Sequence, residues 1–406
     1  MSQHFVPAQL AHSAQLRHYC LMVIKKLWFV VVLLLVGCEA ERGETAVFPT
    51  PLPPATTIPL IPTPPPTLTP VPPPPSSLAP TPTPTTPPLP SPTTPATPHP
   101  IFPYTIAGLR ADHYPGGSIR LRRVVAEQPG FTQAYIDYLS DGLTITGMMH
   151  TPSGAGPFPV VILLHGYIDR DEYWAGADTW QMAELLAQNG YIAIAPDLRT
   201  WGESDSGVSL FHTGLVRDVV NLISSLPSLP QADAERVGLW GHSMGGGVAT
   251  KVLLVDERVK TAVLYAPNSA DDADLIGRWG PGCLPGQSEA AGDKCNPGDF
   301  IPADLPPALV AAYLSAAADP VLLRQIAPIY HLDFLTAPLQ IHIGLADGAA
   351  LEQTPPEWAE KLYGALQAAG KEATYFTYPD QGHFFLGESW QLFTSRALTH
   401  FAEQLR

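Results

Sequence analysis

Hydrophobic positions in the C-terminal three quarters of the chain follow two alternating patterns. Short, wholly apolar runs rich in β-branched residues, such as FPVVILLHG (158–166) and YIAIAPD (191–197), predict buried central strands. Segments with apolar residues three and four positions apart, such as 179–190 and 215–226, predict amphipathic helices. This alternation from residue 135 onward predicts an α/β fold, with a mostly parallel, doubly wound sheet covered on both faces.

The same patterns place further elements as far as the C-terminus. A hairpin is expected where AYIDYL is followed by residues 143–152. The other expected strands are 236–243, 259–267, 339–344 and 373–379, and the other expected helices are 245–255, 356–370 and 390–405. Residues 267–327 show no regular pattern, so an irregular insert is expected after the sixth expected strand.

Composition changes sharply in the first hundred residues. The stretch from Pro49 to Pro100 holds 24 of the 47 prolines and is otherwise mostly Thr, Leu, Ser and Ala. Such a segment buries too little apolar surface to offset the entropy of ordering, so residues 39–100 are expected to be a disordered linker. A proline-rich ligand for a recognition domain is the alternative. The folded region is then 101–406, the size of one large domain.

A short apolar segment precedes the linker, in MVIKKLWFVVVLLLVGC (22–38). Two lysines followed by an apolar run about half as long as a membrane span are typical of a secretory signal, and the true start could be Met22. The ending LVGC resembles the lipobox of bacterial lipoproteins, which implies that residues 1–38 hold the signal peptide and that Cys38 carries the lipid. The protein is then expected to be extracytoplasmic and anchored to the membrane. A simple secretory peptide and an uncleaved anchor are the alternatives.

Net charge and cysteine content limit the kinds of partner, cross-link and metal site that can be expected. The net charge is −15, which argues against a nucleic-acid partner and against electrostatic docking on anionic lipid. In an oxidising compartment Cys283 and Cys295 could form a disulfide worth roughly 2–3 kcal/mol. A metal site is the weaker alternative, because no second pair of Cys or His lies at ligand spacing.

A glycine-flanked serine lies where an expected strand meets an expected helix, in VGLWGHSMGGG (237–247). This is the context in which a serine nucleophile sits on a sharp, strained turn. Gly241 and Gly245 flank Ser243 because such a turn leaves no space for side chains, and the helix start directs backbone amides at an anion. A serine hydroxyl is a poor nucleophile without a base, so an acid and a histidine should follow it in the chain.

His383 is the expected base, because it alone among the downstream histidines lies in a loop directly after a strand, in YPDQGHFF. The other downstream histidines are His331, His342 and His400. Asp347, in the loop after the penultimate strand, is the expected acid. Asp380 lies only three positions from the histidine, and Asp197 precedes the serine, so both are weaker candidates for the acid.

Residues 135–406 resemble the α/β-hydrolase superfamily, in particular the catalytic domain of prolyl oligopeptidases and their dienelactone-hydrolase-like relatives. The resemblance rests on LLHGY, PDLRTWGESD (196–205), GHSMGGG, APIYHLDFLTAPLQIHIGLAD (327–347) and YPDQGHFF. It implies that Ser243 is the nucleophile, Asp347 the acid and His383 the base. It also implies an oxyanion hole made by the backbone N–H groups of Met244 and Tyr167, where each donor commonly supplies about 3–4 kcal/mol.

The sequence departs from these relatives at three places. The acid is followed by DGAALEQTPP, a longer loop than the frequent D-x-x-V-P, and residues 200–201 are Thr-Trp where Gly-His is frequent. Residues 101–134 are too short for the β-propeller that restricts prolyl oligopeptidases to peptides. The absence of a propeller favours cleavage of carboxylic esters or amides, and with the signal segment the sequence predicts an extracytoplasmic serine hydrolase. A peptidase of the prolyl oligopeptidase type and a non-catalytic binding module of the same fold are the alternatives.

The insert 267–327 lies where relatives carry lids. It is expected to cover the serine and to shape the pocket for the acyl or leaving group, and a solvated loop closed by a disulfide is the alternative. The expected chemistry takes a small-molecule ester or a peptide and requires neither a cofactor nor a metal.

Overall fold

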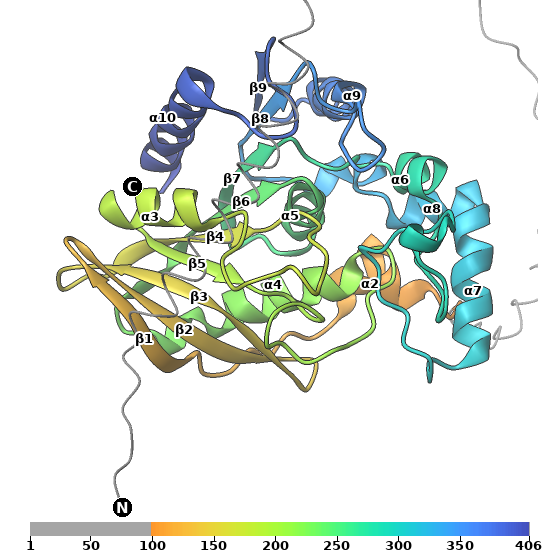
Figure 1. The fold of residues 1–406 in the computed structure, drawn as a ribbon, viewed down its shortest axis with the longest axis horizontal. Helices are drawn as coiled ribbons and strands as arrows, with labels where there is room; N and C mark the ends of the chain where they lie inside the picture. Colours follow the sequence, from red (N-terminus) through yellow and green to blue (C-terminus); the bar gives the residue numbers. More distant parts are fainter. Residues whose placement is uncertain (1–98, 406) are drawn as a thin grey trace, which may run out of the picture. The chain divides into compact units, whose positions relative to one another are not determined.

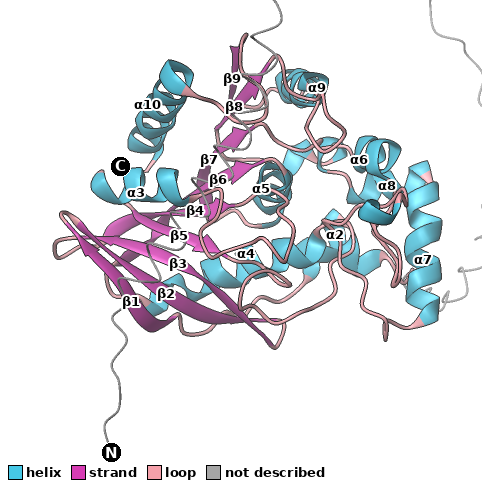
Figure 2. Cartoon of the chain, viewed as in Figure 1, coloured by secondary structure: helices cyan, strands magenta, loops and turns pink. Residues whose placement is uncertain are grey.

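The computed structural model describes residues 99–405, which form a nine-stranded sheet with helices on both faces (Figure 1, Figure 2). The strands lie in the order β1-β2-β3-β5-β4-β6-β7-β8-β9. Their bounds are β1 (Arg120–Gln128), β2 (Phe131–Ser140), β3 (Leu143–Pro152), β4 (Phe158–Leu164), β5 (Ile192–Pro196), β6 (Ala232–His242), β7 (Val259–Tyr265), β8 (Leu339–Gly344) and β9 (Ala373–Tyr378). The predicted signal segment and almost all of the predicted linker lie outside the described residues.

The sheet has a parallel part and an antiparallel part. β4 to β9 run parallel to one another, whereas β1, β2 and β3 form an antiparallel meander that joins β5 through β3. β4, β5 and β8 are buried along most or all of their length, as expected of strands covered on both faces. Because parallel strands end at one edge of the sheet, the residues that follow β6, β8 and β9 gather there.

The helices divide between the two faces of the sheet (Figure 1). α3 (Trp180–Gln188) and α10 (Gly387–Gln404) cover one face, and α4 (Thr213–Ser225), α5 (Met244–Val255) and α9 (Pro356–Ala368) cover the other. All five were predicted from their apolar spacing, and their bounds agree with the expected ones within three residues. α5 is buried along nearly its whole length and packs on β4, β6 and β7, which places its first turn at the centre of the sheet edge.

Two elements near the start of the folded region were not predicted. β1 is exposed along almost its whole length and pairs only with β2, so it presents no alternating apolar face that a sequence pattern would show. The short helix α2 (Ile106–Ala111) packs against α5, and the Thr105 hydroxyl accepts a hydrogen bond from the backbone of Gly108 at its first turn. The sequence analysis expected six strands before the insert. Since β1 is an additional strand, the insert follows the seventh strand.

The segment between β7 and β8 contains three α-helices joined by a long irregular stretch, so the prediction of a wholly irregular insert was wrong. It contains α6 (Asp272–Trp279), α7 (Pro307–Ala318) and α8 (Pro320–Ile326). The helices were missed because each is short, and because the uncharged sequence of α7 shows no polar face. A disulfide joins Cys283 to Cys295 within the insert, as the sequence predicted for an oxidising compartment.

The insert has a hydrophobic cluster of its own, separate from the core of the sheet. Tyr313 and Ile326 from the insert pack there with Leu210 and Phe211, which precede α4, and with Ile101 at the start of the folded region. Within the described residues no single helix is long and apolar enough to cross a membrane. The bent pair α7 and α8 passes that test together, by length and composition only.

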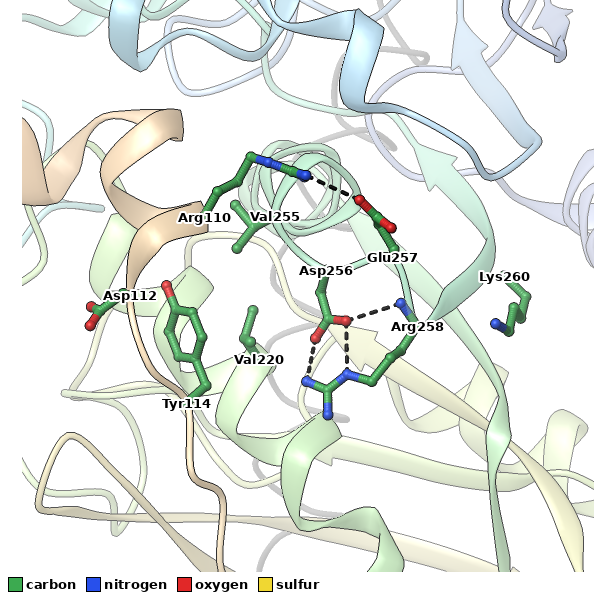
Figure 3. Close-up of a pocket in the computed structure, with 9 residues that line it drawn as sticks. All are labelled: Arg110, Asp112, Tyr114, Val220, Val255, Asp256, Glu257, Arg258 and Lys260. Carbon is green, nitrogen blue, oxygen red and sulfur yellow. Dashed lines mark hydrogen bonds and ion pairs between the residues drawn. The ribbon is translucent and has the colours of Figure 1, made fainter.

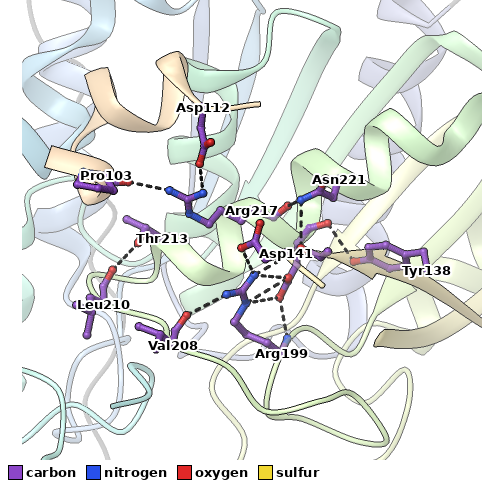
Figure 4. A network of polar contacts seen from close by, with 12 residues as sticks. Pro103, Asp112, Tyr138, Asp141, Arg199, Val208, Leu210, Thr213, Arg217 and Asn221 are labelled. Atoms are coloured by element: carbon purple, nitrogen blue, oxygen red, sulfur yellow. Dashed lines mark hydrogen bonds and ion pairs between the residues drawn. The ribbon is translucent and has the colours of Figure 1, made fainter. Parts of the chain in front are cut away.

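A buried arginine network ties the strand β5 to α4 and to the β2–β3 hairpin (Figure 4). The Arg199 guanidinium donates to both carboxylate oxygens of Asp218, to Asp141 and to the carbonyl oxygen of Val208. The Arg199 and Asp218 side chains are 5% and 0% exposed, so this ion pair is almost completely removed from water. The arginine of the PDLRTWGESD motif therefore holds the fold together and does not face the candidate active site.

Candidate active site

Ser243 lies on a strained turn between β6 and α5. Its backbone φ and ψ are 52° and −119°, a conformation that residues with side chains rarely adopt. A Cβ at Gly245 would lie 2.1 Å from the carbonyl oxygen of Leu164, and a Cβ at Gly241 would lie 2.4 Å from that of Gly245. Glycine is therefore required on both sides of the serine, as the sequence predicted.

Backbone contacts hold the serine in place. The Ser243 N–H donates to the carbonyl oxygen of Tyr265 at the end of β7, and the Ser243 carbonyl accepts from the backbone of Gly246 and Asn268. The residue is 7% exposed, at the N-terminus of α5, where unpaired amides and the helix dipole favour negative charge. This environment suits an oxyanion that develops beside the serine.

The predicted acid and base meet at the same edge of the sheet. The Nδ1 atom of His383 lies 2.9 Å from Oδ2 and 3.1 Å from Oδ1 of Asp347, whose side chain is 0% exposed. Burial lowers the pKa of His383 most strongly, the hydrogen bond to Asp347 opposes this, and the net pKa lies below its ordinary value. The imidazole is therefore held as a neutral base.

Sequence reasoning missed a third member of this group, Thr354. Its hydroxyl lies 2.9 Å from Oδ2 of Asp347 and 3.0 Å from the carbonyl oxygen of Ala266, and its single proton is shared between these two acceptors. The backbone N–H of Gly348 donates to Oδ1 of Asp347 at 2.7 Å. Thr354 belongs to the loop after the acid, which is longer here than in the relatives named above. Arg278 of the insert donates to three carbonyl oxygens of the same loop, at residues 348, 350 and 351. The extra length therefore supplies a hydroxyl to the acid and an anchor for the insert.

The other histidines and acids considered from the sequence have different partners. The His342 ring in β8 bonds to Gln340 and Tyr378, and the His400 ring bonds to Thr261. The carboxylate of Asp197 accepts hydrogen bonds from Thr146 and Tyr173. Asp347 is the carboxylate that contacts His383.

The loop after β4 passes directly beside the serine. A Cβ at Gly166 would lie 3.1 Å from the Cβ of Ser243, so glycine permits this close approach. Tyr167 comes next in the loop, and Met244 is the first residue of α5, so the two predicted oxyanion donors belong to segments that meet here. Trp201, which replaces the frequent histidine, donates its indole N–H to the carbonyl oxygen of Ile168 and supports the loop.

A second histidine–carboxylate pair adjoins the first, and the sequence did not reveal it. The carboxylate of Asp178 lies 2.7 Å from Nδ1 of His242, the residue before the serine, and also accepts the N–H of Gly166 at 2.8 Å. Asp178 stands two residues before α3, where the sequence alone resembles a helix cap. Only the tertiary structure brings its carboxylate to the serine turn.

The insert contributes to a small cavity beside the loop after β4. The cavity has a volume of about 40 Å³ and is lined by Tyr167, Trp279, Asn296, Pro297 and Glu352. Three of these residues come from the insert and one from the loop after the acid. The insert therefore lies beside Tyr167, and the expectation that it covers the serine stays a prediction.

A larger hollow of about 400 Å³ lies at the opposite end of α5 (Figure 3). Four of its charged groups are paired with one another, Arg110 with Glu257 at 3.0 Å and Arg258 with Asp256 at 2.6 Å. A helix of twelve residues is about 18 Å long, so this hollow is far from the serine at the other end. Among residues 99–405 no group of three or more His, Cys, Asp or Glu side chains is suited to hold a metal ion.

Comparison with known proteins identifies the family. The model of the alpha/beta hydrolase family matches residues 161–396, which is more than half of the chain. The chain therefore belongs to the alpha/beta hydrolase family, and the fold class and the family expected from the sequence are confirmed.

Individual relatives are more distant. Esterase FrsA of Yersinia enterocolitica is 29% identical over 137 residues, which are 32% of this chain and 30% of that protein. The chain spans less than half the length of the curated relatives that it matches. An acetyl xylan esterase of Thermoanaerobacterium superposes with a TM-score of 0.51 at 18% identity, over 71% of this chain and 89% of that one.

The acylaminoacyl peptidase of Pyrococcus horikoshii superposes with a TM-score of 0.49 at 19% identity, over 68% of this chain and 42% of that one. At such identities, likeness to a solved structure shows the fold alone.

Proposed function

We propose that this protein is a serine hydrolase in which Ser243, His383 and Asp347 form a catalytic triad. The observation that carries the proposal is the contact between the His383 ring and the buried Asp347 carboxylate, at the same sheet edge as the strained serine turn. These residues stand in the order Ser, acid, His that the fold requires. The family supports hydrolysis as the reaction class.

The tautomer of His383 follows from its partner. A carboxylate only accepts hydrogen bonds, so Nδ1 of His383 carries a proton and Nε2 is left as the basic atom. His383 Nε2 then takes the proton of Ser243 as its oxygen attacks the carbonyl carbon. The same proton goes to the leaving alcohol, an acyl-enzyme remains, and water attacks it by the reverse sequence. The N–H groups of Met244 and Tyr167 stabilise the oxyanion in both steps.

We propose small carboxylic esters as the substrates, because a small cavity adjoins Tyr167, whose backbone N–H is a proposed oxyanion donor. The cavity beside Tyr167 has a volume of about 40 Å³. Since one water-sized probe occupies about 10–15 Å³, this space holds only a few non-hydrogen atoms. A short acyl chain fits such a space, whereas a bulky acyl group does not. Peptide hydrolysis by the same triad is therefore the second candidate function.

Two measurements test this proposal. A fluorophosphonate probe should label the wild-type protein and not the Ser243→Ala variant, and the wild type should hydrolyse p-nitrophenyl acetate. Absence of labelling in correctly folded wild type would refute the triad. Turnover of an aminoacyl anilide at a higher kcat/KM than the ester would replace the esterase assignment with a peptidase.

We also propose that the protein is a lipid-anchored, extracytoplasmic enzyme. The support is the lipobox-like sequence that ends at Cys38, which lies outside the described residues, together with the disulfide between Cys283 and Cys295. Cys38→Ser should move the protein from the membrane fraction of its host cells to the soluble fraction. Retention of this variant in the membrane would contradict the lipid anchor.

A further inference from the structure

The Asp178–His242 pair is not part of the proposed triad, yet it links three segments that build the site. Oδ2 of Asp178 accepts the N–H of Gly166, just before Tyr167, and lies 2.7 Å from Nδ1 of His242, just before Ser243. The Nε2 atom of His242 lies 3.1 Å from the backbone carbonyl oxygen of His383. One chain of hydrogen bonds therefore joins the oxyanion loop, the serine turn and the loop of the base.

The two partners of the His242 ring define its charge. A carboxylate and a backbone carbonyl oxygen only accept hydrogen bonds, so both ring nitrogens of His242 must be donors. An imidazole with two N–H groups is a cation. The His242 side chain is 1% exposed and that of Asp178 is 7% exposed, so the cation is shielded from water and is paired with one buried carboxylate.

The electrostatics agree with this geometry. Burial acts to lower the pKa of His242, but attraction to Asp178 and the hydrogen bond between them outweigh it, and the net pKa is raised. Burial acts to raise the pKa of Asp178, but attraction to His242 and the hydrogen bond from its ring outweigh burial, so the net pKa of Asp178 is lowered. Both shifts stabilise the charged forms.

We propose that Asp178 and the His242 imidazolium are positioning residues that align the oxyanion loop with the base loop and disfavour a second positive charge on His383. The ring centroids of His242 and His383 are 4.6 Å apart. The charged or titratable groups around His383 are Asp347, His242 and Asp178. Asp347 stabilises a proton on His383, whereas the nearby cation opposes it, so His383 remains a free base at lower pH than it would otherwise.

The effect should appear in the acid limb of the pH profile. Two unit charges 4.6 Å apart, the distance between the ring centroids, repel each other by Coulomb's law. Expressed as a shift in the pKa of His383, this repulsion is about 0.7 units in bulk water and about 2.7 units at an effective dielectric constant of about 20. His242→Gln should therefore raise the apparent pKa of the acid limb of kcat/KM by at least about 0.7. At pH values below the apparent pKa of both the wild type and the variant, a rise of one unit in that pKa lowers kcat/KM about tenfold.

Asp178→Asn gives a second, graded test. The asparagine oxygen still accepts the Gly166 N–H. The negative charge that keeps His242 protonated is lost, so the variant loses both the carboxylate charge of Asp178 and the positive charge of His242. Since the cation is the nearer charge to His383, the limb should move in the same direction but less than in His242→Gln. The matched control is His342→Gln, because burial holds the pKa of His342 well below its ordinary value and the change removes no charge. That control should leave the limb in place.

A direct measurement does not depend on activity. In the full-length wild type with ¹⁵N-labelled histidine, NMR at neutral pH should show both ring nitrogens of His242 in the protonated range. The signals would be assigned by their loss in His242→Gln, or in His242→Asn if the first variant fails to fold. An unprotonated nitrogen on His242, or an acid limb unmoved in folded His242→Gln, would overturn the proposal.

This inference rests on the proposed serine hydrolase function, but its failure is distinguishable from failure of that function. A wild type that neither binds the fluorophosphonate nor hydrolyses the ester refutes the triad, whatever the NMR spectrum shows. A labelled, active wild type with a neutral His242 refutes only the positioning pair.

Discussion

Replacement of Asp347 by asparagine is the most informative single change at the proposed site. Two donors face the carboxylate besides His383, the Gly348 N–H at Oδ1 and the Thr354 hydroxyl at Oδ2. The backbone N–H of Gly348 cannot reverse its role, so it retains the amide oxygen of the new side chain. The amide NH2 then occupies the Oδ2 position, 2.9 Å from Nδ1 of His383, and the Thr354 hydroxyl turns to accept.

An NH2 group at that position donates to Nδ1 and drives the ring proton to Nε2, the atom that must accept the serine proton. The wrong tautomer at the corresponding position of a serine protease lowers kcat about 10⁴-fold. We therefore expect Asp347→Asn to reduce kcat by about 10³–10⁴-fold, which corresponds to about 4–5.5 kcal/mol of transition-state stabilisation. The loss should appear in kcat more than in KM, because the substrate itself is not contacted.

The assay is steady-state hydrolysis of p-nitrophenyl acetate at saturating substrate, with the fold of each variant checked by circular dichroism. Asp380→Asn is the matched control, because it removes a carboxylate from the same loop as His383 and should keep wild-type kcat. A folded Asp347→Asn variant within tenfold of wild type would refute the reasoning. A large loss in Asp380→Asn would reassign the acid.

Three further outcomes are expected for stability and pH dependence. Asp218→Asn leaves the buried Arg199 without its main partner and should lower the free energy of unfolding in urea by about 3–5 kcal/mol, whereas a loss below about 1 kcal/mol would contradict a buried pair. Gly245→Ala should abolish fluorophosphonate labelling, because its Cβ would lie 2.1 Å from a backbone oxygen. Gly247→Ala, whose Cβ would have its closest contact at 3.0 Å, should reduce labelling less, and equal losses in the two variants would count against the strained turn. Because the pKa of His383 is lowered, wild-type kcat/KM should fall only below about pH 6.5 as pH decreases, and a limb at higher pH would show that burial does not dominate.

Much of the fold could be predicted from local patterns. Buried parallel strands are continuous apolar runs, and their helices have apolar residues three and four apart, so the strands after residue 131 and the helices outside the insert were found. β1 was missed because it is an exposed edge strand that pairs with the backbone of β2 and has no buried face, so its sequence shows no apolar alternation. α6 and α8 were missed because each has fewer than nine residues, and α7 because its uncharged sequence shows no polar face. Residues of all three pack in a hydrophobic cluster formed with residues 101, 210 and 211.

The candidate site divides in the same way. Ser243, Asp347 and His383 were predicted because each follows a strand, and parallel strands end at a common edge. Thr354 and Asp178 could not be predicted, since neither follows a strand and nothing near them in the sequence marks their partners. Their roles come from loops that fold back over the sheet edge.

The sequence by itself determined the order of the buried strands and of the helices that cover them, the need for glycine around the serine, and which serine, acid and histidine could act together. These are local properties of hydrophobic spacing, backbone sterics and chain order. Only the tertiary structure decided that His242 lies between the Asp178 carboxylate and the carbonyl oxygen of His383, that the acid loop supplies a hydroxyl, and that the insert adjoins Tyr167. Burial and hydrogen-bond partners fix those properties, and both depend on residues far apart in the chain.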